Sequence, residues 1–246
     1  MKSLSNKFLK DIFNKISQKK IYRIVFLGDS ITSTEWVHPN FREIIEYTLK
    51  DYIGKKTKDW KTPSWYIRAI NSALDGGTTK DILESLNDYV FIYEPDLVIL
   101  QGTRNDYTLG INIKNHVQNI HKIIKKIIDK KINIVFCGTT PSLNNDKNEE
   151  YILYIKKAPL ISKKFNIQYI DLFHKLQEYD LTKFFTFISE GNPDEGLKPG
   201  NLDTGHPNQL GNAYIAKILL KDIFDIKFDP ELYIKDTCKG RMFPRY

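Results

Sequence analysis

Short runs of β-branched and aromatic residues alternate along this chain with longer stretches of helical periodicity, and this alternation limits the possible folds more than any other feature. Strands are predicted over 21–27, 67–74, 96–101, 132–137 and 167–170. Apolar residues recur at helical spacing over 40–52, 78–93, 111–130, 149–165 and 208–224. Continuously apolar strands that alternate with helices are typical of a parallel sheet covered on both faces. The sequence therefore predicts one α/β domain with helices on each side of its sheet.

The composition is that of an ordinary globular protein. With 246 residues, 41% of them hydrophobic and 27% charged, the chain suits one large domain and is neither disordered nor a disulfide scaffold. Its two cysteines, Cys137 and Cys238, and its five histidines show no metal-ligand spacing. His116 and His121 are expected on the surface of a helix.

The net charge of +7 comes from lysines spread over the whole chain, which favours a solvated surface over a nucleic-acid patch. No apolar run approaches the ~20 residues of a membrane span, and residues 1–20 lack the features of a signal peptide. We therefore expect no nucleic-acid partner, no integral membrane segment and a cytoplasmic location.

Two terminal segments flank the predicted domain, which covers 21–225. In the segment 1–20, four apolar residues lie at helical spacing between lysines: Leu4, Phe8, Ile12 and Ile16. This pattern favours a helix packed on its own domain over a basic helix on a membrane surface. The segment 226–246 is expected to be a tail, and the sequence leaves open whether it folds back on the domain or contacts another subunit. The oligomeric state stays open as well.

Polar residues and glycines follow three of the predicted strands. The run Gly-Asp-Ser at 28–30 follows the first strand, Gly76 and Gly77 follow the second, and 102–106 follows the third. Because ligands bind beyond the carboxyl ends of parallel strands, we expect these groups to line one crevice. Ser30 can expose its hydroxyl beside the unpaired N–H groups of a helix start. Considered alone, the same serine is better explained as a helix cap.

Asp203 and His206 lie in the run Asp-Thr-Gly-His-Pro-Asn at 203–208. A carboxylate at this spacing can hold one imidazole nitrogen and leave the other to take a proton from a hydroxyl group. The backbone N–H groups of Ser30 and Gly76 and the side-chain amide of Asn105 can supply donors for an oxyanion. Each motif by itself also fits a structural turn, a helix entry or a polar loop.

Together and in this order, the motifs resemble those of the SGNH (GDSL-type) hydrolase family. The matching stretches are Gly-Asp-Ser at 28–30, N-S-A-L-D-G-G-T-T at 71–79, P-D-L-V-I-L-Q-G-T-R-N-D at 95–106 and D-T-G-H-P-N at 203–208. The resemblance implies a flavodoxin-like three-layer α/β/α domain with a mainly parallel five-stranded sheet. It also implies an enzyme that hydrolyses esters or thioesters and needs no metal or other cofactor.

The resemblance further implies a role for each matched residue. Ser30 corresponds to the nucleophile, His206 to the base and Asp203 to the carboxylate that orients it. The implied oxyanion hole consists of Ser30, Gly76 and Asn105.

The third motif departs from the family pattern. The family usually reads G-x-N-D, whereas Thr103 and Arg104 separate Gly102 from Asn105 here. Either the loop is one residue longer, or Thr103 takes the position of the glycine. Arg104 either points into the site and favours a substrate with a negative group, or pairs with Asp106 on the surface.

The substrate is indicated less directly. Trp36 follows the serine turn, where its ring can stack on a sugar, and Asp29 is a further expected substrate contact. Trp60 and Trp65 are expected to pack at the opposite edge of the sheet. The segment 186–202, with three glycines, can form a wall of the pocket.

We expect a serine esterase that removes a short acyl group, acetyl above all, from a carbohydrate or other small polar molecule. The alternatives are an acyltransferase that uses the same acyl-enzyme, a non-catalytic binding module of the same fold, and a nucleic-acid binder.

Overall fold

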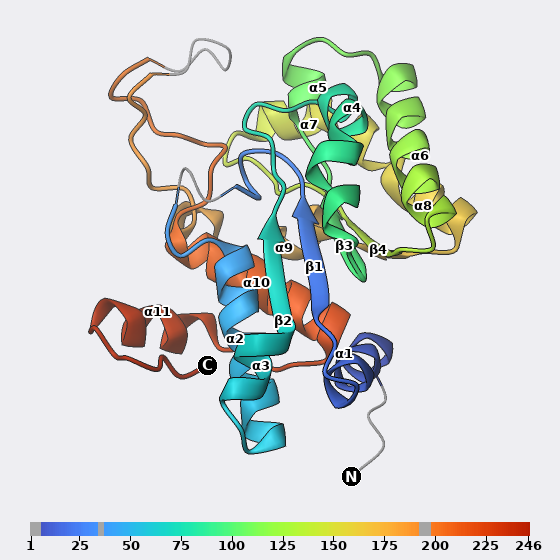
Figure 1. Cartoon of the computed structure of the whole chain (residues 1–246). Coiled ribbons are helices and arrows are strands. Elements are labelled where there is room, and N and C mark those ends of the chain that lie inside the picture. The colour runs from blue at the N-terminus through green and yellow to red at the C-terminus, as the bar shows by residue number, and fades with distance from the viewer. Residues whose placement is uncertain (1–5, 34–36, 192–197) are drawn as a thin grey trace.

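Five parallel strands form the middle of three layers in the computed structural model, which describes residues 6–33, 37–191 and 198–246 (Figure 1). The strands are β1 (Tyr22–Leu27), β2 (Ile67–Asn71), β3 (Leu97–Gln101), β4 (Asn133–Cys137) and β5 (Gln168–Ile170). Their order is β2-β1-β3-β4-β5, and every neighbouring pair is parallel. This is the flavodoxin-like order, which reverses between β1 and β3. The predicted α/β/α fold is therefore confirmed.

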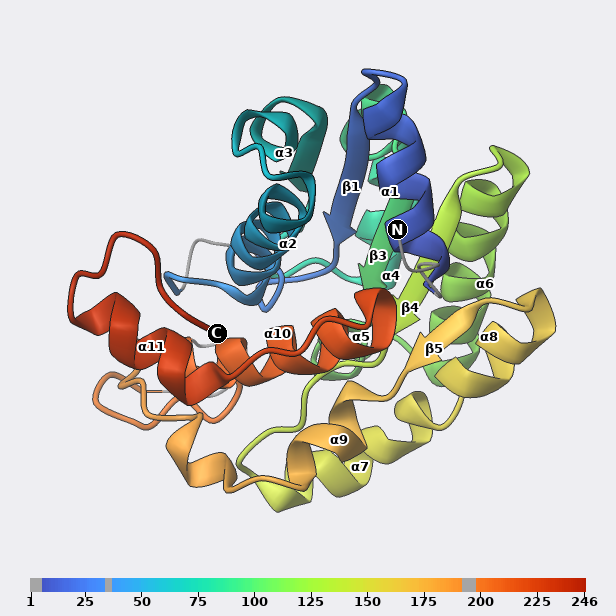
Figure 2. The same cartoon turned by 90° about the horizontal axis from the view of Figure 1, so that it is seen from below.

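Helices cover both faces of the sheet (Figure 2). On one face the core joins the strands to α1 (Lys7–Ser17), α2 (Phe41–Thr57) and α10 (Gln209–Phe224). On the other face it joins them to α4 (Thr79–Tyr89), α6 (Ile113–Asp129) and α8 (Ala158–Phe165). Ile99 of β3 belongs to the first core and its neighbour Val98 to the second, because successive side chains of a strand point to opposite faces. A strand buried on both faces has to be apolar throughout.

Local sequence determines where α2 and α4 begin. Asn40 and Glu43 form a capping box at the start of α2, in which the Asn40 N–H donates to the Glu43 carboxylate at 2.9 Å. Thr78 and Asp81 form the equivalent box at the start of α4, where the Thr78 N–H donates to Asp81 at 2.8 Å. These reciprocal bonds satisfy N–H groups that a helix end leaves unpaired. The box at Thr78 fixes α4 directly after the two glycines of the second motif.

Several boundaries differ from the sequence prediction. The helix predicted over 149–165 is two helices, α7 (Asn145–Ile155) and α8, because Pro159 stands in the first turn of α8 and fits only at a helix start. The strand predicted over 67–74 ends at Asn71. The helix predicted over 78–93 is α4 followed by the short 3-10 helix η1 (Phe91–Tyr93). Among the described residues, five short helices were not predicted: α3 (Lys61–Tyr66), α5 (Asn105–Thr108), α9 (Leu172–Gln177), η2 (Leu181–Lys183) and α11 (Pro230–Cys238).

The N-terminal helix α1 packs on the face that carries α2 and α10. Phe8 and Ile12 are buried in the core of that face, and the Asn6 side chain donates to the Ile223 carbonyl oxygen of α10 at 2.7 Å. Leu4 lies outside the described residues.

The segment 226–246 contains α11 and returns to α2. The Tyr246 hydroxyl donates to the Asp51 carboxylate at 2.6 Å, and the Tyr47 hydroxyl donates to the Pro244 carbonyl oxygen at 2.9 Å. The rings of Tyr47 and Tyr246 also meet edge to face. These contacts hold the end of the chain against α2.

Trp60 and Trp65 do not pack as expected. They are 74% and 57% exposed, because the short helix α3 that carries Trp65 buries only Pro63. Figure 1 shows α3 at the end of the sheet opposite to the arrowheads of β1 and β2. The two rings therefore lie far from the loops that follow the strands.

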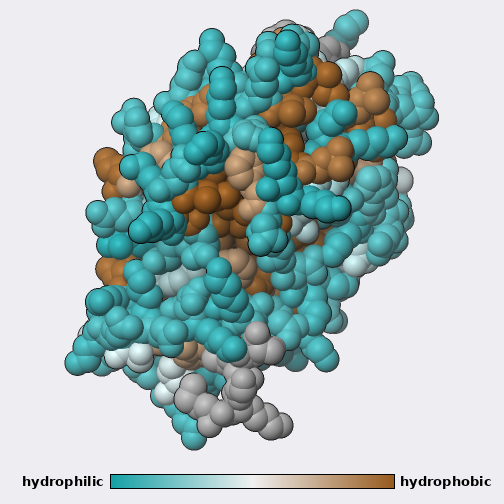
Figure 3. All heavy atoms as spheres, turned by 90° about the vertical axis from the view of Figure 1, so that its right-hand side faces the viewer, coloured by the Kyte–Doolittle hydropathy of each residue, from teal (hydrophilic) through white to brown (hydrophobic). Residues whose placement is uncertain are grey.

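The side of the molecule that carries α6 and α8 is mainly hydrophilic, with apolar patches between the polar side chains (Figure 3). A hollow of about 450 Å³ lies between the start of α1 and the end of α8, and Ile132 and Phe165 contribute to its lining. In the described part of the chain, no helix is long and apolar enough to cross a membrane.

Candidate active site

The loops that follow β1, β2 and β3 meet beyond the carboxyl ends of these strands, together with a turn that comes much later in the chain. Ser30 lies in the turn after β1, and its hydroxyl oxygen is 2.8 Å from Nε2 of His206, which is 176 positions away in sequence. The carboxylate of Asp29 accepts the Ile31 N–H at 3.0 Å, and the Asp29 carbonyl oxygen accepts the Thr32 N–H at 2.9 Å. The fold thus brings the predicted histidine against the predicted serine, which lies on a turn held by these two hydrogen bonds.

Asp203 holds the other side of the imidazole. Its Oδ2 atom is 2.8 Å from His206 Nδ1, and its Oδ1 atom accepts the N–H groups of Gly205 at 2.8 Å and His206 at 3.0 Å. Burial opposes the charge on this carboxylate, but the bonds from His206 and Gly205 prevail and hold the pKa of Asp203 below its ordinary value. An ionised Asp203 keeps the ring proton on Nδ1, so that Nε2 is able to accept a proton from Ser30.

The start of α10 fixes the position of this turn. Asn208 caps the helix, and its side-chain oxygen accepts the Gly211 N–H at 3.0 Å. Asn212 donates to the Pro207 carbonyl oxygen at 2.8 Å and accepts the Phe41 N–H at 3.0 Å. Since Phe41 is the first residue of α2, these bonds connect the histidine turn to the helix that follows the serine turn.

The predicted oxyanion donors lie in adjacent loops. Gly76 has a φ of +65°, a conformation that favours glycine, and a Cβ at this position would meet nothing within 4 Å. The Asn105 amide nitrogen donates to the Gly77 carbonyl oxygen at 3.0 Å. A primary amide has two N–H donors, so this bond leaves the second one for a ligand. Within the described residues, the N–H groups of Ser30 and Gly76 have no protein acceptor.

Asp106, the residue after Asn105, ties the third motif to the start of α4. Its carboxylate is fully buried. It accepts the N–H of Thr79 at 2.7 Å and the hydroxyl of Thr79 at 2.5 Å. Because Thr79 follows the two glycines closely, these bonds set the position of Asn105 relative to Gly76.

His116 completes this cluster, and its expected place on a helix surface is wrong. The residue is 3% exposed, and its Nδ1 atom is 2.8 Å from the Asp106 carboxylate. A signal for this burial was present in the sequence, because His116 precedes Ile120, Ile123 and Ile127 on the apolar stripe of α6. His121 lies on the same helix and contacts the ring of Phe165, with the ring centroids 4.5 Å apart.

Arg104 and Asp29 differ in what they offer a ligand. The Arg104 guanidinium donates to the Gly205 carbonyl oxygen at 2.9 Å, while Asp106 binds Thr79 and His116 instead of the arginine. Asp29 is 2% exposed, so its carboxylate supports the serine turn rather than facing a bound molecule. Burial raises the pKa of Asp29, although the Ile31 N–H and the charge of Arg104 oppose this shift. Trp36 lies outside the described residues.

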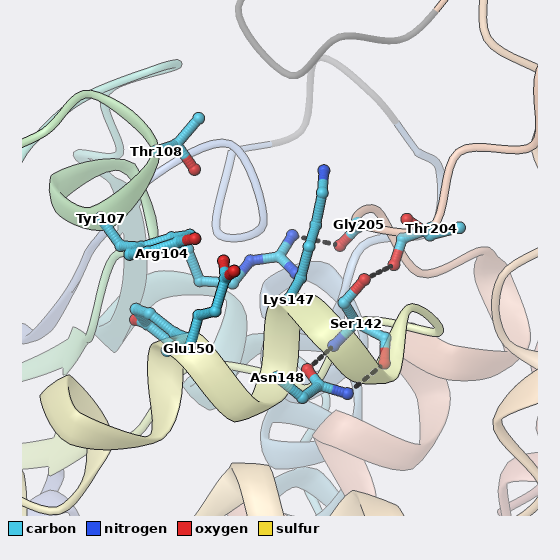
Figure 4. A pocket seen from close by; sticks show the side chains of 10 residues that line it. Arg104, Tyr107, Thr108, Ser142, Lys147, Asn148, Glu150, Thr204 and Gly205 are labelled. Carbon is cyan, nitrogen blue, oxygen red and sulfur yellow. Dashed lines mark hydrogen bonds between the residues drawn. The ribbon is translucent and has the colours of Figure 1, made fainter.

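A cavity of about 310 Å³ opens beside the histidine turn, between α5 and α7 (Figure 4). Its lining consists of Arg104, Tyr107, Thr108, Ser142, Lys147, Asn148, Glu150, Tyr151, Thr204 and Gly205. Ser142 anchors one wall, since its hydroxyl donates to the Thr204 carbonyl oxygen at 2.8 Å. Among the described residues, no group of three or more His, Cys, Asp or Glu side chains is placed to hold a metal ion.

The chain is similar to known proteins in sequence and in fold. A family model described as GDSL-like lipase/acylhydrolase matches residues 24–219. An arylesterase from Vibrio mimicus is 23% identical over 164 residues, which cover 64% of this chain and 70% of that protein.

Solved structures with the same fold include a lipase/acylhydrolase from Enterococcus faecalis, with a TM-score of 0.61 and 20% identity over 92% of this chain and 100% of that chain. An acetyl xylan esterase from Geobacillus stearothermophilus has a TM-score of 0.61 and 16% identity, and the match covers 83% of this chain and 95% of that chain. At this level of identity, the structural matches establish the fold alone.

The fold and these relatives define the class of protein as an ester-hydrolysing enzyme with three α/β/α layers. The family model covers most of the 246 residues, so it identifies more than a shared fold. The chain belongs to the GDSL-like lipase/acylhydrolase family.

Proposed function

We propose that this enzyme is a serine esterase that removes a short acyl group, acetyl above all, through a covalent acyl-enzyme on Ser30. The observation that carries the proposal is the contact of 2.8 Å between Ser30 Oγ and His206 Nε2. It is supported by Asp203, whose carboxylate lies 2.8 Å from the other ring nitrogen. A hydroxyl, a base and an orienting carboxylate in this arrangement form the standard means of activating a serine.

The reaction follows from these roles. His206 takes the hydroxyl proton as Ser30 Oγ attacks the ester carbonyl carbon. Collapse of the tetrahedral intermediate breaks the bond to the alcohol, which leaves with the proton held by His206. Water then attacks the acyl-enzyme with the same base, and the acid product and free Ser30 result. Asp203 stays ionised throughout and stabilises the imidazolium that forms in each half-reaction.

The negative charge that develops on the carbonyl oxygen needs fixed donors. The N–H groups of Ser30 and Gly76 and the second N–H of the Asn105 amide are the donors that we assign to it. Donors that are in place before substrate binds are supported by the hydrogen bonds between the loops of Gly76 and Asn105, from Asn105 to the Gly77 carbonyl oxygen and from Thr79 to Asp106. Preorganised donors of this kind supply a large part of catalysis in acyl transfer.

A polar alcohol moiety, such as a carbohydrate, is supported by the cavity beside the histidine turn. Its lining includes charged, hydroxyl and amide side chains beside the rings of Tyr107 and Tyr151. A long acyl chain requires an apolar trench, whereas an acetyl group does not. An acetyl xylan esterase among the structural relatives acts on a substrate of this kind.

The test compares the parent protein with Ser30→Ala and with Ser64→Ala, a change of an exposed serine in α3. A fluorophosphonate probe is expected to label the parent and Ser64→Ala but not Ser30→Ala. Esters of 4-nitrophenol with acetate, butyrate and octanoate then give the acyl preference, and acetylated sugars give the alcohol preference. Labelling and acetate hydrolysis that persist in Ser30→Ala refute the proposal. Adding acceptor alcohols measures how much acyl group is transferred instead of hydrolysed.

A further inference from the structure

Two cationic side chains and one carboxylate face the cavity beside the histidine turn. Arg104 comes from the loop that precedes α5, and Lys147 and Glu150 come from the first turns of α7. Figure 4 shows all three side chains at the same opening, with the Arg104 guanidinium directed towards Gly205. Among the described lining residues the formal charge is therefore positive.

Arg104 has binding capacity that the fold does not use. A guanidinium group has five N–H donors in a planar fork. One nitrogen, Nη2, donates to the Gly205 carbonyl oxygen at 2.9 Å. Arg104 takes part in none of the ion pairs between described residues. The positive charge of Arg104 acts on the carboxyl group of Asp29, but burial outweighs this effect and raises the pKa of Asp29.

The cavity is adjacent to the groups that carry the proposed chemistry. Arg104 precedes Asn105 in sequence, and Gly205 precedes His206. Because His206 returns its proton to the leaving oxygen, the alcohol part of an ester has to lie on the side of the histidine turn. The hydrogen bond of 2.9 Å from Arg104 to the Gly205 carbonyl oxygen places the guanidinium next to this turn, so the inference directs a group attached to that alcohol towards Arg104.

We propose that this cavity binds an anionic group, such as the carboxylate of a sugar acid, on the alcohol part of the substrate. The inference rests on the proposed function of Ser30 and His206, and it specifies which substrates they act on. A carboxylate matches the planar fork of Arg104 and can form two charge-assisted hydrogen bonds with it. Lys147 adds positive charge at the same opening, and Glu150 weakens the attraction.

The experiment uses a pair of substrates that differ only in charge: the acetate ester of a methyl glucuronoside and the same ester of a methyl glucoside. The measured quantity is the ratio of kcat/KM for the anionic substrate to kcat/KM for the neutral substrate. A hydrogen bond to a charged group contributes roughly 1.5–3 kcal/mol, so Arg104→Gln is expected to lower this ratio about 10- to 100-fold. Lys147→Gln is expected to lower it less, and Glu150→Gln to raise it.

Lys10→Gln is the control for removal of one positive charge. Lys10 is exposed on α1, at the end of the sheet opposite to the cavity, and the ratio is expected to stay at the parent value. If Arg104 has a purely structural role, Arg104→Gln lowers kcat/KM for both substrates alike and the ratio stays unchanged. This result overturns the inference. The 4-nitrophenyl monoester of succinic acid carries its charge on the acyl part. If Arg104→Gln lowers kcat/KM for this ester and leaves the ratio for the sugar esters unchanged, Arg104 does not bind an anionic group on the alcohol part.

Failure of the underlying function gives a different result. If the parent hydrolyses neither sugar ester and Ser30 does not react with a fluorophosphonate, the serine mechanism is refuted, and the inference is refuted with it. If both sugar esters are hydrolysed through Ser30 and no variant changes the ratio, the mechanism stands and only the anionic subsite is refuted.

Discussion

Replacing Asp203 with asparagine removes the carboxylate while keeping the shape of the side chain. Asp203 accepts two backbone N–H groups through Oδ1 and faces His206 Nδ1 with Oδ2. The asparagine oxygen can keep the two backbone bonds. The amide nitrogen then faces Nδ1 and donates to it, which moves the ring proton to Nε2. A protonated Nε2 cannot accept the proton of Ser30.

The size of the effect follows from this change of tautomer together with the loss of a charge next to the imidazolium. In serine enzymes with the same arrangement, such an exchange lowers kcat about 10⁴-fold. At 1.36 kcal/mol for each factor of ten, this corresponds to about 5.4 kcal/mol of transition-state stabilisation. Since the two backbone bonds persist, the turn keeps its place, and KM is expected to change much less than kcat.

The assay is steady-state hydrolysis of 4-nitrophenyl acetate, with circular dichroism and thermal unfolding to check the fold. Asp171→Asn is a chemically matched control. Asp171 also lies three residues before a histidine and contacts its Nδ1 atom at 2.7 Å, but this pair is exposed on α9. The control is expected to keep the parent kcat. The reasoning is refuted if Asp203→Asn retains more than about a tenth of the parent kcat while Ser30→Ala is inactive.

Three further changes test the loops around this site. Asn105→Ala removes one proposed oxyanion donor and is expected to lower kcat about 10²–10³-fold, or ~2.7–4 kcal/mol, with little change in KM. If kcat for 4-nitrophenyl acetate falls less than tenfold, Asn105 is not such a donor. His116→Ala leaves the buried Asp106 carboxylate without its imidazole partner and is expected to lower the free energy of unfolding in urea by about 3–5 kcal/mol. His116→Gln keeps an N–H donor and is expected to recover part of this loss. If the alanine variant is as stable as the parent, the pair has no structural role. Asp29 has a raised pKa in the folded protein, so the native state binds more protons than the unfolded state between the ordinary and the raised pKa, and stability falls as pH rises through this window. Asp29→Asn is therefore expected to gain Tm relative to the parent as pH rises above the ordinary pKa of an aspartate, and a difference in Tm that does not vary with pH contradicts this cause.

The sheet and its polar edge were predictable because they depend on short stretches of sequence. A strand such as β3 lies between two helical layers and is buried at every position, so its apolar run identifies it without knowledge of its partners. The order of the strands did not follow from such runs. The predicted site residues Ser30 and His206 lie within hydrogen-bonding distance. The rule that loops after parallel strands share one edge assigned Ser30 to this edge, and the family resemblance paired it with His206.

Long-range packing accounts for what the sequence did not indicate. The pattern Asp-x-x-His occurs at Asp203 and at Asp171, and both aspartates contact the imidazole three residues later. Only the fold places the first pair beside Ser30 and the second on an exposed helix. His116 was misjudged for the same reason, because its environment depends on a carboxylate from another loop. The exposure of Trp60 likewise depends on how little of α3 the domain covers.

The loops at the polar edge hold one another through hydrogen bonds that cross from motif to motif. Asn105 and Thr103 donate to the Gly77 carbonyl oxygen, and Arg104 donates to the Gly205 carbonyl oxygen beside His206. A change in one loop therefore alters the positions of groups in the next, and the effects of paired substitutions here should not simply add. The benefit of such a network is preorganisation: donors that other loops already hold need little rearrangement when charge develops on the substrate. In the subsite that we propose, the hydrogen bond from Arg104 to Gly205 would link an anionic group held by Arg104 to the turn that carries His206.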